Sequence, residues 1–135
     1  MHLHLLLSNE AKFDGVSHPP PWIKVNFDSA VFKELGTVGV RVVTHDCQGL
    51  VLASMSEQIL LSQSVVEVEA IATVKAIHFV QKLSLPSVIF EGDFEIIIKA
   101  LCSEDDSFSS YGHLIAEAKV CSDSFLSCCF SHIHK

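Results

Sequence analysis

The chain has few basic residues. Its 135 residues include 9 Lys and Arg against 16 Asp and Glu, which gives a formal net charge of −7. Nonspecific binding to DNA or RNA depends on Lys and Arg side chains that neutralise phosphates. The charge therefore argues against a protein that holds nucleic acid by its net field alone, and any such role would need metal ions or a local basic patch.

Disulfide, zinc and membrane signals are also missing. The number of cysteines is odd and no C-x-x-C occurs, so we expect reduced thiols, no disulfide partner and no zinc site. No run reaches the roughly 18 apolar residues of a membrane helix, and we expect no membrane partner. Residues 1–10 lack the basic flank and cleavage site of a signal peptide. The five cysteines are Cys47, Cys102, Cys121, Cys128 and Cys129.

What the chain does have is enough apolar material for one core. Hydrophobic residues make up 49% of the sequence and the mean hydropathy is +0.40, which favours a folded globule over disorder. Residues 1–21 end in the proline run "SHPPP", which suits an extended segment outside a sheet. We therefore predict a lead-in linker over residues 1–21 and a single domain over residues 22–135, and we expect a monomer.

Hydrophobic patterning predicts an α/β fold with a mixed sheet. Three β-rich segments come first, and a helix then leads into a fourth strand that should lie beside the first. Ser64 followed by Glu67 is typical of a capping box at the start of that helix. The predicted strands cover residues 22–30, 37–44, 50–56, 88–91 and 125–135, and the predicted helices cover residues 64–83, 93–102 and 113–125.

Three carboxylates occupy positions where a charge is costly. Asp28 ends the first predicted strand, Glu69 lies among apolar residues early in the long helix, and Asp93 follows the fourth strand. If the first and fourth strands are parallel, the two aspartates meet at one edge and the helix brings Glu69 over them. At about 4 Å each pair would repel by roughly 4 kcal/mol at an effective dielectric near 20. A cluster of oxygen ligands of this kind suits Mg²⁺ or Mn²⁺.

Each carboxylate also has an ordinary structural interpretation. Asp93 belongs to a residue type favoured as the N-cap of the helix that it precedes. Glu69 fits a first-turn glutamate favoured by the helix dipole, and Asp28 fits the start of a turn. Their occurrence together and in order favours a site.

Four segments together resemble the ribonuclease H type 1 domain, in particular the retroelement-related, reverse-transcriptase-like branch of plants. They are "KVNFDSA", "GVRVVTHDCQG", "VEVEAIATVKAI" and "FEGDFEIIIKAL". The resemblance implies a five-stranded mixed sheet of strand order 3-2-1-4-5 flanked by helices. It also implies hydrolysis of the RNA strand of an RNA–DNA hybrid by two Mg²⁺ or Mn²⁺ ions, in the nucleus or cytoplasm. Asp28, Glu69 and Asp93 match three of the family's four catalytic and metal-binding carboxylates, with Asp28 bridging the ions.

Two of the departures from the family pattern bear directly on the expected metal site. The fourth carboxylate of the family follows the last strand together with a final helix, and this chain ends at Lys135, so we expect the last helix to be missing. Ser29 stands where the family usually has glycine. These departures weaken the metal site and leave an alternative open, in which the domain is an inactive relic that serves as an interaction module.

Overall fold

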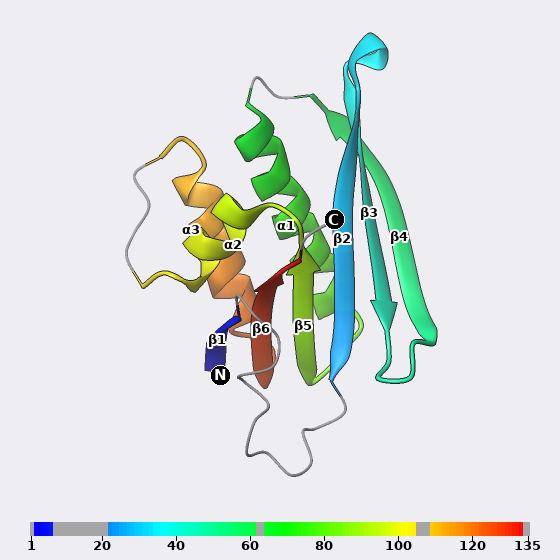
Figure 1. The fold of residues 1–135 in the computed structure, drawn as a ribbon, viewed down its shortest axis with the longest axis vertical. Coiled ribbons are helices and arrows are strands. Elements are labelled where there is room, and N and C mark those ends of the chain that lie inside the picture. Colours follow the sequence, from blue (N-terminus) through cyan, green and yellow to red (C-terminus); the bar gives the residue numbers. More distant parts are fainter. Residues whose placement is uncertain (1, 7–21, 62–63, 105–108, 134–135) are drawn as a thin grey trace.

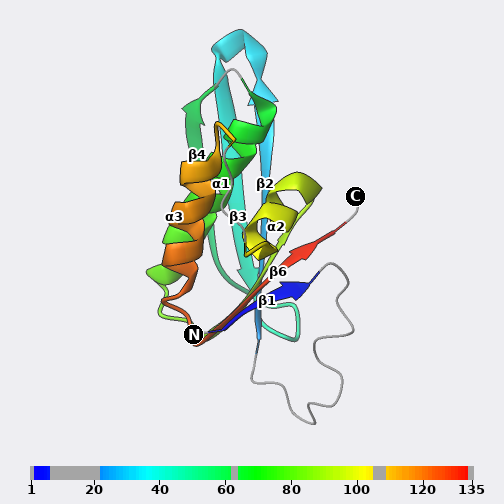
Figure 2. The same cartoon turned by 90° about the vertical axis from the view of Figure 1, so that its left-hand side faces the viewer.

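The computed structural model describes residues 2–6, 22–61, 64–104 and 109–133. A mixed sheet lies against a layer of helices (Figures 1 and 2). The elements in chain order are β1 (His2–Leu6), β2 (Ile23–Phe32), the 3-10 turn η1 (Lys33–Leu35), β3 (Thr37–His45), β4 (Val51–Leu60), α1 (Val65–Gln81), β5 (Ser87–Gly92), α2 (Glu95–Cys102), α3 (Gly112–Ser122) and β6 (Ser127–His132).

The sheet confirms the predicted strand order. The spatial order is β1-β6-β5-β2-β3-β4, and its last five members are the predicted order 3-2-1-4-5 seen from the other edge. β2, β3 and β4 pair antiparallel, whereas β5 pairs parallel to both β2 and β6. The sheet is therefore mixed, as the helical crossover between the hairpin and β5 requires.

One strand was not predicted. Residues 2–6 form β1, which pairs parallel to β6 with His2 opposite Ser127 and Leu6 opposite Ser131. This strand lies within the segment expected to be a linker, and it widens the sheet to six strands. The proline run of that segment lies outside the described residues, as do His134 and Lys135 at the end of the predicted last strand.

Burial follows the strand pattern that the sequence predicts. In β2 the side chains of Ile23, Val25 and Phe27 are buried and alternate with more exposed neighbours, whereas all six residues of β5 are buried. In a half-buried strand apolar and polar residues alternate, whereas a central parallel strand is a continuous apolar run. The sheet therefore has its most enclosed strand in the middle, next to β2.

Helix α1 begins where the capping signal predicts. The hydroxyl of Ser64 accepts a hydrogen bond from the backbone N–H of Glu67 at 3.3 Å, which satisfies one free donor of the first turn. Its buried face joins α2, α3 and the sheet in one hydrophobic core. On the other face of β5, Ile89 forms a small second cluster with Cys129 and Trp22. No helix among the described residues is long and apolar enough to cross a membrane.

Candidate metal and nucleic-acid site

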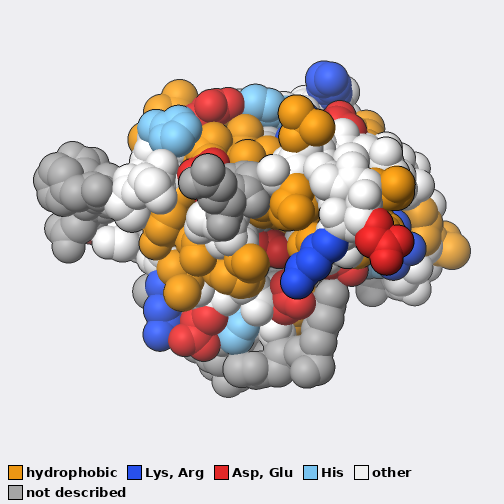
Figure 3. Space-filling view, turned by 90° about the horizontal axis from the view of Figure 1, so that it is seen from above, with side chains coloured by type: hydrophobic (Ala, Val, Ile, Leu, Met, Phe, Trp, Pro, Cys, Tyr) orange, Lys and Arg blue, Asp and Glu red, His pale blue; other side chains and the backbone are white. Residues whose placement is uncertain are grey.

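The candidate site lies just beyond the point where the parallel pairing of β2 and β5 ends. The parallel pairing of these strands extends from Ile23 opposite Val88 to Asn26 opposite Glu91. Asp28 and Asp93 each stand two residues beyond that last pair. Figure 3 views this end of the molecule, where acidic side chains lie among hydrophobic ones. The topology therefore brings both aspartates to the same edge of the sheet.

Asp28 is half-buried and lies within β2, four residues before its end. It is directly opposite Arg41 on β3. The two side chains line a shallow recess with Asn26, Val43 and Ile133. They also line a larger groove of about 470 Å³ across β2, β3 and β4. A carboxylate next to a guanidinium on one face of a sheet is a favourable cross-strand pair of charges.

Glu69 lies in the first turns of α1 and is held by Ser29, the residue that follows Asp28 in β2. The hydroxyl of Ser29 donates a hydrogen bond to Oε1 of Glu69 at 2.5 Å. The backbone oxygen of Glu69 accepts a second bond from the hydroxyl of Thr73 at 2.9 Å. The hydrogen bond from Ser29 thus joins β2 to α1 at Glu69, which we predict from the sequence to be a metal ligand.

Asp93 shares a small recess with Glu69. Phe27, Gly92 and Phe94 also line it. The Asp93 side chain is exposed, and α2 begins two residues later with Phe94 as its N-cap. The interpretation of Asp93 as the cap of α2 is therefore wrong. Asp28 does not line this recess. Because successive residues of a strand point to opposite faces of the sheet, its side chain and that of Phe27, which packs in the helix-side core, lie on opposite faces.

His132 reaches this edge from β6. Its Nε2 lies 3.2 Å from the backbone oxygen of Asp93, and because a carbonyl oxygen only accepts, Nε2 carries the proton. Its Nδ1 lies 3.6 Å from Oε2 of Glu95. The imidazole therefore ties the last strand to the segment that carries Asp93. The sequence pattern did not predict this contact between His132 and Asp93.

The three carboxylates are less closely grouped than a bound ion would require. Among the described residues, one other group of three potential ligands has its ligand atoms all within 4.8 Å of one another. It consists of His78, Glu117 and Cys121 and does not include the three carboxylates. A Mg²⁺ ion holds its oxygen ligands at about 2.0–2.1 Å. The residues at the sheet edge fit Mg²⁺ or Mn²⁺ by donor chemistry, while Ser29 engages Glu69.

Glu91 is a further carboxylate at this edge that the sequence did not single out. Its side chain is buried, with 8% of the residue exposed, and Oε1 accepts a hydrogen bond from the amide nitrogen of Asn26 at 3.0 Å. This bond satisfies a polar group that would otherwise be costly to bury. The signal in the sequence was Glu91 itself, an acidic residue in a strand whose six positions are all buried.

The architecture defines a ribonuclease H-like domain. A family model described as reverse transcriptase-like matches residues 26–135. The chain belongs to this reverse transcriptase-like family. Comparison with curated protein sequences gives no match.

Solved structures of ribonucleases H share the fold. RNase H1 of the halophilic archaeon Halobacterium salinarum has a TM-score of 0.74 at 17% identity, with 84% of this chain and 86% of that one covered. The N-terminal RNase H domain of a Mycobacterium tuberculosis protein has a TM-score of 0.72 at 13% identity, covering 86% and 84%. LC11 RNase H1, isolated from compost, was solved in complex with an RNA/DNA hybrid, and it has a TM-score of 0.69 at 20% identity, covering 84% and 86%.

Proposed function

We propose that this domain binds RNA–DNA hybrids and hydrolyses the RNA strand with Mg²⁺ or Mn²⁺. The observation that carries the proposal is the arrangement at the sheet edge. Asp28 and Asp93 stand equally far beyond the last β2–β5 pair, and Glu69 shares a recess with Asp93. Family membership and the LC11 complex with an RNA/DNA hybrid support the choice of substrate.

In this proposal the carboxylates of Asp28, Glu69 and Asp93 hold the metal ions. Divalent ions at such a site activate water and stabilise the leaving oxygen of a phosphodiester. Arg41 lies across from Asp28 in the 470 Å³ groove and supplies a positive charge for a backbone phosphate. His132 keeps the Asp93 segment against β6 through its contact with the Asp93 backbone oxygen.

A second candidate function is an inactive interaction module. The observation that favours it is the hydrogen bond from Ser29 to Glu69, because a carboxylate engaged in this way is less available to a metal ion. In this case the groove beside Arg41 binds nucleic acid without hydrolysing it. The monomeric state and a place in the nucleus or cytoplasm stay predictions under either function.

The test is a titration of Mg²⁺ and Mn²⁺ with the purified chain on a labelled RNA–DNA hybrid, beside Asp28→Asn. Hybrid binding is measured in the same samples by fluorescence anisotropy, and folding by circular dichroism. We expect metal-dependent cleavage of the RNA strand that falls at least 100-fold in Asp28→Asn. This loss is expected because the amide lacks the negative charge that a divalent ion requires.

The outcomes separate the two functions. Binding without cleavage in a folded wild-type chain supports the interaction module and excludes the nuclease. Equal cleavage by the wild type and Asp28→Asn also contradicts the nuclease, because the activity then comes from another source. A folded chain that neither binds nor cleaves the hybrid excludes both functions.

A further inference from the structure

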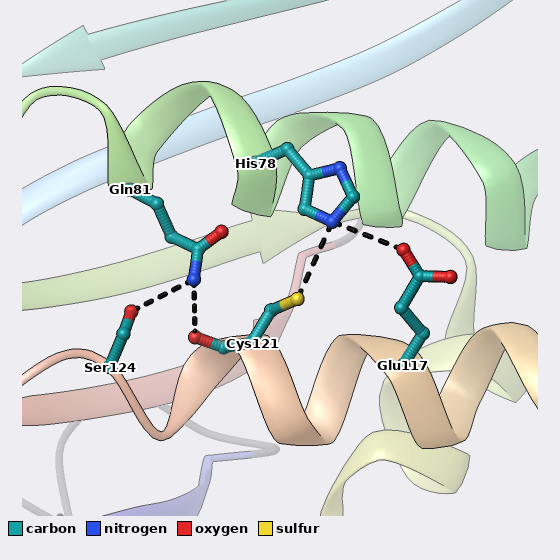
Figure 4. Close-up of polar contacts among 5 residues, drawn as sticks. All are labelled: His78, Gln81, Glu117, Cys121 and Ser124. Carbon is teal, nitrogen blue, oxygen red and sulfur yellow. Dashed lines mark hydrogen bonds and ion pairs between the residues drawn. The ribbon is translucent and has the colours of Figure 1, made fainter.

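A second group of ligand-type side chains lies on the helical layer, away from the sheet edge. His78 belongs to α1, whereas Glu117 and Cys121 belong to α3. His78 Nε2 lies 3.1 Å from Oε2 of Glu117 and 3.4 Å from Sγ of Cys121 (Figure 4). Glu117 and Cys121 are four residues apart, so they share one face of α3. Three different ligand types from two helices therefore converge on one point.

The two helices are fixed to each other next to this point. Gln81 lies three residues after His78, and its Nε2 donates to the backbone oxygen of Cys121 and to the hydroxyl of Ser124, each at 3.0 Å (Figure 4). The position of the Cys121 backbone relative to α1 is thus set by hydrogen bonds outside the cluster. The side chains of His78 and Glu117 are 43% and 47% exposed, which leaves the cluster open to an ion from solvent.

Two of the three ligand-atom separations are close to the edge lengths of a zinc tetrahedron. Zn–N, Zn–O and Zn–S bonds measure about 2.1, 2.0 and 2.3 Å, so a tetrahedral ion separates its N and O ligands by about 3.3 Å and its N and S ligands by about 3.6 Å. The observed separations are 3.1 and 3.4 Å. Sγ and the Glu117 oxygen lie within 4.8 Å of each other.

We propose that His78, Glu117 and Cys121 bind one Zn²⁺ ion, with water as the fourth ligand, and that the ion links α1 to α3. Sulfur and imidazole ligands select Zn²⁺ over Mg²⁺, which prefers oxygen alone. This site is chemically different from the carboxylates of Asp28, Glu69 and Asp93. The cysteine and glutamate come from one helix turn and the histidine from another helix, so no zinc motif is visible in the sequence.

Without zinc, the same residues would form an ordinary ion pair between His78 and Glu117 with a thiol beside it. That pair needs no cysteine, and an exposed pair of this kind stabilises a protein little. Dependence of metal binding on Cys121 therefore separates the zinc site from the ordinary ion pair.

The experiment uses Co²⁺ as a spectroscopic probe of the purified, metal-free, reduced chain. We expect one equivalent of Co²⁺ to produce the charge-transfer absorption of a thiolate–Co²⁺ bond, and Zn²⁺ to displace it. Cys121→Ser and His78→Gln should lose this absorption. Cys47→Ser is the matched control, because Cys47 is an exposed thiol on the β3–β4 turn, and it should keep the absorption unchanged.

Thermal unfolding gives an independent readout. Zn²⁺ should raise the unfolding temperature of the wild type and of Cys47→Ser, since a ligand that binds only the folded state stabilises it. It should not raise that of Cys121→Ser. Asp28→Asn should retain both responses, which separates this site from the proposed nuclease. A folded wild type without the absorption, or a Cys121→Ser variant that keeps it, overturns the proposal.

Discussion

The hydroxyl of Ser29 and the carboxylate of Glu69 lie 2.5 Å apart and join β2 to α1. This bond is formed between two residues at the centre of the candidate site. Ser29 therefore affects both the stability of the fold and the availability of Glu69.

Removing the Ser29 hydroxyl should destabilise the domain and release Glu69. A hydrogen bond to a charged group contributes about 1.5–3 kcal/mol, so we expect Ser29→Ala to lower the free energy of unfolding by about 1–2 kcal/mol at this half-buried position. On the proposed function, the variant should also need several-fold less Mn²⁺ for half-maximal cleavage of a hybrid. Urea unfolding and a metal titration measure the two effects. An unchanged Mn²⁺ requirement would show that the bond does not limit metal binding.

Gly92 is needed for the packing of Phe27. A Cβ atom at Gly92 would lie 2.8 Å from Cζ of the Phe27 ring, which is well inside van der Waals contact. Overpacking of this kind costs about 1–3 kcal/mol, so Gly92→Ala should reduce the stability by that amount. In a Phe27→Leu background the cost should fall, because the ring atom is gone. Urea unfolding of the four proteins gives the coupling energy, and equal costs in both backgrounds would contradict the contact.

The aromatic centre of the core should dominate its stability. The Phe90 ring lies 5.4 Å from that of Phe130 and 5.9 Å from that of Phe125, centroid to centroid, and Phe90 is fully buried. Phe90→Ala should cost about 3–5 kcal/mol. The control is Leu126→Ala, whose side chain is 71% exposed, with an expected change within about 0.5 kcal/mol. Comparable effects of the two changes on urea unfolding would show that Phe90 does not pack as described.

Cys128 should make the domain less stable at alkaline pH. Burial raises the pKa of its thiol, and the charges of Cys129, Cys102 and Asp123 raise it further. The unfolded chain then releases the thiol proton above about pH 8.5, while the folded chain keeps it. Unfolding is therefore favoured as pH rises, and the stabilisation present below this pH is progressively lost.

The measurement for Cys128 is the free energy of unfolding from pH 7 to pH 10. Cys128→Ala should lose stability less steeply over this range than the wild type. Cys47→Ala serves as the control, since Cys47 is exposed, and its pH dependence should match that of the wild type. A Cys128→Ala curve parallel to the wild-type curve would contradict the assignment.

Much of the fold could be predicted because local patterns and tertiary burial agree. The alternation in β2, the continuous apolar run of β5 and the Ser64 cap of α1 all have the structure that their patterns indicate. In β1 the alternation "HLHLL" was present in residues 2–6, but five residues next to a proline run carry a weak signal. Only the exposed edge of β6 explains why they form a strand.

The candidate site was predictable in its residues and less so in its contacts. A carboxylate in an apolar strand or helix can be recognised from sequence, and this identified Asp28 and Glu69. The partners depend on which side chains the fold brings opposite each other. Arg41 follows from the β2–β3 register, and the histidine that reaches Asp93 comes from the far end of the chain. Residue spacing gives no access to either relationship.

The pairing of β1 with β6 joins the first strand of the chain to the last. During synthesis β1 leaves the ribosome long before its partner exists, and closing so large a loop slows folding. Until β1 docks, the outer backbone groups of β6 form an unpaired edge, which is the kind of surface that adds strands from other chains. β1 covers this edge and becomes the edge strand in its place, so the docking of its five residues decides which strand the finished sheet presents to other chains.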